Sequence, residues 1–239
     1  MSLYIGTIRM VSEDALYIFG KILFLFITIP LFLFWILLGS FVELGNDVVA
    51  AISGPAYFII PIFAMSGFKS LLPVAVGMGS TRTELLKVFY GVGIVGVTIT
   101  IFCLNILQQF LVRLYDQLNV QANILHPGTF FNMDYTFWSY FLIDLLFGIF
   151  LFCFTFLLFS LYYRLGLKKS IVTLMILTIT GLLLIYSNTL KPNHFEWIWN
   201  HSLSDMTVYF IILLISFAAL FTTFPILKHA PLKPKTKKE

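Results

Sequence analysis

The sequence predicts an all-α membrane protein: six transmembrane helices, an amphipathic interfacial helix before them, and a cytoplasmic coupling elbow between helices 2 and 3. Of its 239 residues, 59% are hydrophobic and 11% are charged, whereas soluble domains carry about 25% charged residues. The apolar residues gather in six long runs, and a transmembrane helix needs ~20 of them. Such continuous runs exclude membrane β-barrels, whose strands alternate over ~10 residues.

The chain begins with an amphipathic segment, residues 1–21. Apolar side chains recur there at helical spacing, and Arg9 and Glu13 fall on another face. This pattern predicts a helix that lies in the membrane interface. Two roles remain open for it, a simple anchor or a lever packed against a cytoplasmic partner.

Residues 22–227 form the predicted transmembrane domain, and residues 228–239 form a basic cytoplasmic tail. The fifth span is the shortest of the six. The tail holds five lysines and is expected to be attracted to anionic lipid headgroups. The six predicted spans are 22–42, 48–68, 88–112, 138–163, 170–186 and 206–227.

The distribution of lysine and arginine predicts how the chain crosses the membrane. Thirteen of the 15 fall in the N-terminal segment, the loops after spans 2 and 4, and the tail, while Arg113 and Lys191 fall on the other side. Cytoplasmic loops carry the excess of basic residues. Both termini are therefore expected in the cytoplasm.

Residues 69–87 separate spans 2 and 3 and contain Pro73, Gly77 and Gly79. Proline and glycine interrupt helices, so we expect a short elbow at the inner membrane face. A cytoplasmic partner can push such an elbow.

A helix is expected to begin inside this elbow. Thr81 and Glu84 have the T-x-x-E spacing of a capping box, in which each side chain bonds the backbone amide of the other residue. That helix continues into the third span.

One carboxylate, Asp144, lies inside a predicted span. Buried ionisable groups in membranes cost several kcal/mol and are usually paired or functional. Asp144 is a candidate for a substrate path or gate, with Asn105 and Gln108 as possible partners. Alternatively, Asn105 and Gln108 join helices by hydrogen bonds.

No residues suggest catalysis, a metal site or a cofactor in this chain. The cysteines Cys103 and Cys153 lie in separate apolar runs, and the four histidines lie outside the spans. No motif for binding nucleotide phosphates is present, so the chain itself is not expected to hydrolyse ATP. Nucleic acid is not expected as a partner.

This order of elements resembles the ABC-2 type permeases, the membrane subunits of bacterial ATP-driven exporters. Members of that family often carry an apolar stretch with proline, followed by G-x-T/S-R-x-D/E, in the loop between helices 2 and 3. The matching residues here are Pro73, Gly79, Ser80, Thr81, Arg82, Thr83 and Glu84.

The resemblance implies a separate cytoplasmic ATP-binding subunit that docks on Gly79–Glu84, where Arg82 meets an acidic group and Glu84 caps the helix. It also implies a second permease subunit, either another copy or a similar chain, and location in the bacterial plasma membrane. The apolar spans favour amphipathic peptides as the transported molecules, as in the phenol-soluble modulin exporters. A membrane scaffold or immunity accessory protein, and an ion-coupled carrier, are the alternative functions.

Overall fold

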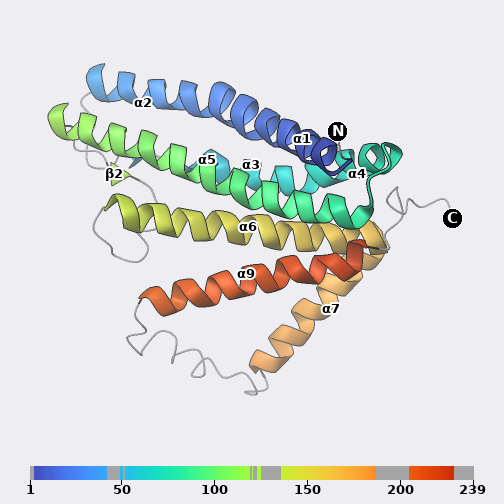
Figure 1. The fold of residues 1–239 in the computed structure, drawn as a ribbon. Helices are drawn as coiled ribbons and strands as arrows, with labels where there is room; N and C mark the ends of the chain where they lie inside the picture. Colours follow the sequence, from blue (N-terminus) through green and yellow to red (C-terminus); the bar gives the residue numbers. More distant parts are fainter. Residues whose placement is uncertain are drawn as a thin grey trace.

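A computed structural model gives the fold, and almost all of the residues that it describes are helical (Figure 1). Two short strands, β1 (Val49–Ala50) and β2 (Asn123–Ile124), pair in parallel. The residues described are 3–41, 49–50, 52–118, 120, 123–124, 136–186 and 205–228.

Among the residues described, five helices are long and apolar enough to cross a membrane, which indicates a multi-pass membrane protein. The predicted span 170–186 coincides with α7 (Leu167–Tyr186), which is not one of these five, so a sixth crossing stays a prediction. The five helices are Tyr4–Phe41, Gly54–Gly77, Arg82–Leu118, Phe137–Leu165 and Phe210–Leu227.

The first of them combines α1 (Leu3–Ala15), the π-helical segment η1 (Leu16–Thr28) and α2 (Ile29–Phe41) without a break. The division expected near residue 21, between an interfacial helix and a separate first span, does not appear as an interruption. Pro30 lies two residues after the last residue of the π-helical segment, in the first turn of α2. Proline has no backbone N–H to donate. In a π-helix each amide bonds the carbonyl five residues earlier instead of four, so the carbonyls that precede Pro30 have different partners from those in an α-helix.

The second membrane helix consists of α3 (Gly54–Ile62), the π-helical η2 (Phe63–Gly67) and α4 (Phe68–Gly77). Pro73 and Gly77 were expected to interrupt the chain, and this prediction was wrong because both lie within α4. Proline in a helix loses one backbone hydrogen bond, but α4 packs against α1 and α5, and this packing stabilises it. The actual connection is therefore shorter than the predicted elbow.

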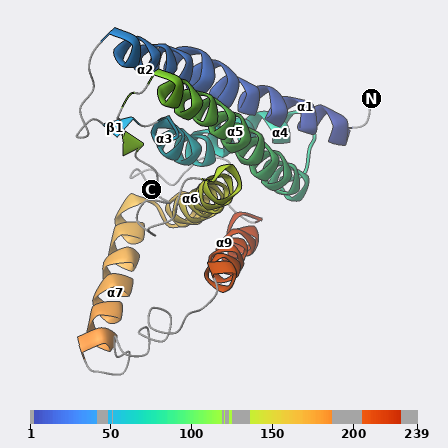
Figure 2. The same cartoon turned by 90° about the vertical axis from the view of Figure 1, so that its left-hand side faces the viewer.

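The remaining helices are α5 (Arg82–Leu118), α6 (Phe137–Leu165), α7 and α9 (Asp205–Leu227). Helix α6 packs against α3, α5 and α9, and the view along the bundle shows it between them (Figure 2). Helix α7 turns away from the bundle (Figures 1 and 2). The turn before α7 is Gly166, whose φ of 78° favours glycine.

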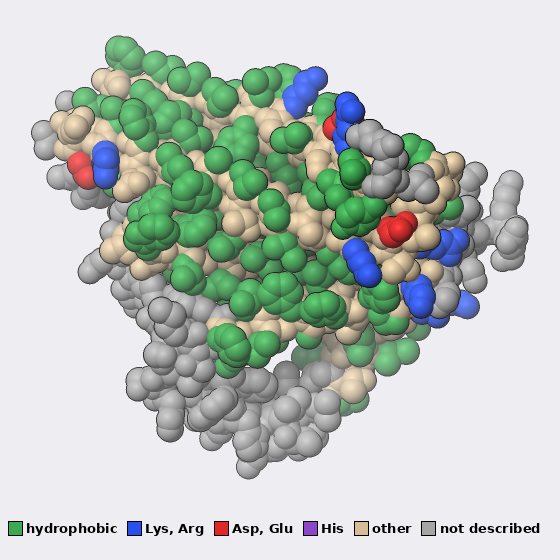
Figure 3. All heavy atoms as spheres, viewed as in Figure 1, with side chains coloured by type: hydrophobic (Ala, Val, Ile, Leu, Met, Phe, Trp, Pro, Cys, Tyr) green, Lys and Arg blue, Asp and Glu red, His purple; other side chains and the backbone are tan. Residues whose placement is uncertain are grey.

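The helices alternate in direction, so several chain segments meet at one end of the bundle. The start of α1, the α4–α5 turn, the α6–α7 turn and the end of α9 all lie there (Figure 1). Most blue lysine and arginine side chains on the visible face gather at the same end (Figure 3). The grouping of these segments matches the predicted one, and the assignment of this end to the cytoplasm remains a prediction.

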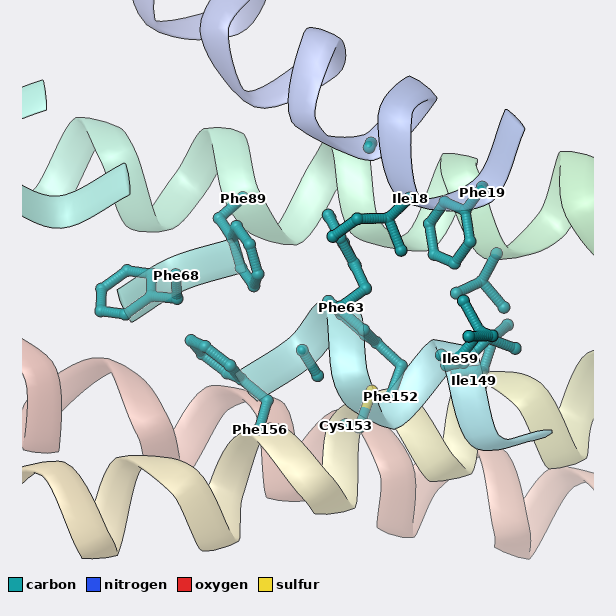
Figure 4. Packing of buried hydrophobic residues seen from close by; sticks show 14 of the residues in the cluster. Ile18, Phe19, Ile59, Phe63, Phe68, Phe89, Ile149, Phe152, Cys153 and Phe156 are labelled. Atoms are coloured by element: carbon teal, nitrogen blue, oxygen red, sulfur yellow. The ribbon is translucent and has the colours of Figure 1, made fainter. Parts of the chain in front are cut away.

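Phenylalanine rings form the centre of the bundle (Figure 4). Phe63 stacks on Phe89 with ring centroids 5.2 Å apart, and Phe89 lies 5.1 Å from Phe156. Gly93 of α5 faces the ring of Phe152, where a Cβ would collide with it. Glycine at this position therefore lets α5 and α6 approach closely.

Candidate functional site

Helix α4 ends in a Schellman motif, which fixes the start of the α4–α5 turn. The Ser80 amide donates to the Ala75 carbonyl at 2.9 Å, and the Gly79 amide donates to the Val76 carbonyl at 3.0 Å. Gly79 has a φ of 91°. Residues with a Cβ are disfavoured in this left-handed conformation. The backbone conformation therefore explains why glycine occupies this position of the predicted motif.

Helix α5 begins with the predicted capping box, which the structure confirms. The Thr81 amide donates to Glu84 Oε2 at 3.0 Å. In return, the Glu84 amide donates to Thr81 Oγ1 at 3.2 Å. Two amides that lack partners inside the helix are thus satisfied, and only residues 78–81 connect α4 to α5.

A side-chain hydrogen bond ties this turn to the N-terminal helix. Thr7 Oγ1 of α1 donates to Ser80 Oγ at 3.1 Å, and both side chains are buried. Helix α1 also packs against α4 and α5. The N-terminal helix, the turn and two membrane helices therefore form one packed unit.

The turn itself remains accessible. Met78 is 50% exposed, Gly79 and Thr81 are exposed, and Arg82 is half-buried. No carboxylate in the described part of the chain lies within ion-pair distance of Arg82. Of the six predicted docking residues, Ser80 faces α1 and the others surround the exposed turn.

A second polar site lies inside the bundle around Asp144, which is completely buried. The Tyr57 hydroxyl of α3 donates to Asp144 Oδ1. Asn105 of α5 donates through Nδ2 to Asp144 Oδ2 at 2.9 Å, and also to the Ile101 carbonyl at 3.1 Å. Asp144 therefore joins three helices, α3, α5 and α6, through a polar clamp made of Tyr57, Asn105 and Asp144.

Sequence reasoning identified Asn105 as a partner of Asp144 and missed Tyr57. Asn105 is confirmed as a partner. Tyr57 was missed, although it is the one tyrosine in the predicted span 48–68, and a buried tyrosine hydroxyl usually finds a hydrogen-bond partner. This rule could have identified Tyr57 from the sequence as a candidate hydrogen-bonding residue.

Gln108, the third predicted residue of this group, lies on the same face of α5 as Asn105 and is 1% exposed. Neither its Oε1 nor its Nε2 has a hydrogen-bond partner among the described residues. The structure thus places Gln108 close to the clamp along the helix but does not bond it to Asp144.

Within the described residues, no group of three or more histidine, cysteine, aspartate or glutamate side chains is arranged to hold a metal ion. Cys103 and Cys153 are both free thiols. The polar clamp is suited to holding helices together, and the exposed turn is suited to contact with another molecule.

The fold and its apolar helices define the class of protein as a multi-pass helical membrane protein. No family model, curated protein or solved structure was found to match the chain.

Proposed function

We propose that this chain is the membrane subunit of an ATP-driven exporter of the ABC-2 type. The observation that carries the proposal is the α4–α5 turn: it is exposed at the basic end of the bundle, closed by hydrogen bonds at both ends, and bonded to the N-terminal helix. A partner that pushes such a turn moves helices instead of deforming a loop.

In this proposal a separate cytoplasmic subunit binds ATP and Mg and docks on Gly79–Glu84. The exposed backbone at Gly79 and Thr81 enters its groove, and Arg82 contacts an acidic group on it. Ser80 has a different role, because its hydroxyl accepts the hydrogen bond from Thr7. Through that bond and the surrounding packing, motion of the partner reaches α1 as well as α4 and α5.

The transported molecule is expected to be an amphipathic or hydrophobic peptide. The bundle exposes many large apolar side chains and few polar ones between its two ends (Figure 3). Sugars and ions need convergent polar ligands, whereas a peptide with an apolar face does not. Two permease subunits, either two copies or two similar chains, line the path.

Asp144 has a defined place in the same proposal, as part of a gate. Its carboxylate joins α3, α5 and α6, so a path that opens between these helices breaks at least one of the two hydrogen bonds. Asp144→Asn is expected to change the rate of peptide export. Export that is unchanged in this variant, at equal protein level, would remove Asp144 from the path.

The main experiment is affinity purification of the chain from its native membranes, followed by mass spectrometry and an ATPase assay. We expect an ATP-binding protein to co-purify. Arg82→Glu should reduce its recovery at least about tenfold, because reversing a charge at an interface typically costs several kcal/mol and 1.4 kcal/mol is a factor of ten. The matched control is Lys69→Glu, an exposed cation in α4 outside the turn.

Two results would contradict this function. One is recovery of no ATP-binding protein from membranes in which the chain is intact. The other is equal recovery with Arg82→Glu and Lys69→Glu. Transport that continues without ATP but stops without a proton gradient would favour an ion-coupled carrier instead.

A further inference from the structure

A surface groove runs between the first helix and α5. Its volume is ≈ 540 Å³. The lining is almost entirely apolar or small, and glycines on both helices keep it open, since a Cβ at Gly20 or Gly91 would meet no atom within 4 Å. The lining residues are Ser12, Ala15, Leu16, Phe19, Gly20, Phe24, Gly91, Val92, Val95, Gly96, Ile99, Thr100 and Cys103.

The two helices that form the groove run parallel and in a constant register. Phe19 packs on Gly96, and the rings of Phe32 and Phe110 lie 5.9 Å apart. The residue numbers differ by 77 in the first pair (96 − 19) and by 78 in the second (110 − 32). A residue of α5 whose number is 77 or 78 higher than that of a residue in the first helix therefore lies at the same depth in the bundle.

Two cations flank the end of the groove that faces the basic end of the bundle. Arg9 precedes Ser12 by three residues, and Lys87 precedes Gly91 by four. Residues three or four apart share a helix face, so both cations lie on the groove side of their helices. The register places Arg9 and Lys87 at the same depth, and both are exposed.

Two carboxylates near this opening already have partners, and a third, Asp14, lies against Gly67 of η2 and does not line the groove. Glu13 Oε1 accepts from Arg9 Nε at 2.7 Å, and Glu84 Oε2 accepts from the Thr81 amide. Arg9 has further guanidinium donors and Lys87 has three ammonium donors. The opening of the groove therefore offers hydrogen-bond donors with positive charge to an anionic group.

The groove has the depth of one membrane leaflet. From Gly91 to Cys103 along the groove, α5 rises ~18 Å at 1.5 Å per residue, and half of the ~30 Å hydrocarbon core is ~15 Å. A helix from another copy would extend across both leaflets, whereas an acyl chain extends across one. Both the depth and the cations at one end fit a lipid.

We propose that this groove binds one phospholipid of the leaflet at the basic end of the bundle. An acyl chain lies between the first helix and α5, and the phosphate contacts Lys87 and Arg9. The proposal does not depend on an ATPase partner, so it stands or falls separately from the transport function.

Native mass spectrometry of the detergent-purified chain tests the proposal, with dioleoyl phosphatidylglycerol as the probe. We expect a bound-lipid peak that Lys87→Gln reduces at least threefold. Lys69→Gln, which removes another exposed lysine at the same end, should leave it unchanged. Dioleoylglycerol, which has the same chains without the phosphate, should bind at least threefold less.

A second pair of variants tests the groove itself. Gly91→Leu fills it at a position where the added side chain meets open space, and it should reduce binding as strongly as Lys87→Gln. Val172→Phe adds bulk to the exposed surface of α7 and should have no effect.

Three results would overturn the proposal. They are equal binding of the phosphate-free lipid, unchanged binding in both Lys87→Gln and Gly91→Leu, or a change from oligomer to monomer caused by Gly91→Leu in light scattering. The last result would assign the groove to a second copy of the chain.

Discussion

The polar clamp around Asp144 leads to a quantitative prediction about stability. Tyr57→Phe removes a single oxygen and leaves the ring, which packs edge-on against Phe147 with centroids 4.9 Å apart. The variant therefore tests the hydrogen bond to Asp144 with little change in packing. Asn105→Leu removes the other donor, which lies 2.9 Å from the carboxylate.

The size of the effect follows from the burial and the chemistry of the acceptor. Hydrogen bonds between membrane helices contribute ~0.6 kcal/mol on average, whereas leaving a buried acceptor without its donor costs ~1–3 kcal/mol. Asp144 is fully buried, so water does not replace a lost donor. We expect Tyr57→Phe to cost about 2 kcal/mol, which lowers Tm by about 4 to 8 °C for a chain of this size.

The assay is thermal unfolding of the purified protein in detergent, with Tyr17→Phe as the control. Tyr17 is 54% exposed, and its ring, which lies beside the Lys21 ammonium, is retained in the variant. In the double variant of Tyr57 and Asn105, the losses should not add, because both donors bind one carboxylate. Shifts no larger than that of Tyr17→Phe, or strict additivity, would refute the clamp.

Three further predictions concern the turn, the core and the topology. Gly79→Ala should cost ~1–2 kcal/mol in thermal unfolding, since alanine disfavours a φ of 91°; an unchanged Tm would contradict the turn geometry. Gly93→Ala should cost ~1–3 kcal/mol by overpacking against Phe152, and Phe152→Leu should recover part of this loss. In a background without the native cysteines, cysteine at Met78 should react with an impermeant maleimide only from the cytoplasm and cysteine at Asp116 only from outside; the reverse pattern would invert the topology.

The sequence was most informative where a local rule determines the structure. The T-x-x-E pattern at Thr81 and Glu84 predicted a helix start because both hydrogen bonds form within four residues. Continuous apolar runs predicted helices for the same reason, since in a membrane each backbone group must be satisfied within its own helix. Hydrophobicity and helical spacing were sufficient for these features.

The sequence was less informative where packing between distant segments decides the outcome. Pro73 is a local helix breaker, but the contacts of α4 with α1 and α5 keep it helical. The π-helical segments η1 and η2 have no pattern that hydrophobicity reveals. Tyr57 and Asp144 are 87 residues apart; a buried tyrosine indicates that a hydrogen-bond partner exists, but the sequence does not indicate which helix supplies it.

The connection between α4 and α5 has a mechanical consequence. Four residues, 78–81, join the helices, and backbone or side-chain hydrogen bonds occupy both of its ends. Because this connection is short and hydrogen-bonded, we expect a displacement of the turn by a few ångströms to tilt α4 and α5 together and to move α1 through Thr7. If the proposed partner binds this turn, a small displacement at the membrane surface would therefore rearrange helices within the bilayer.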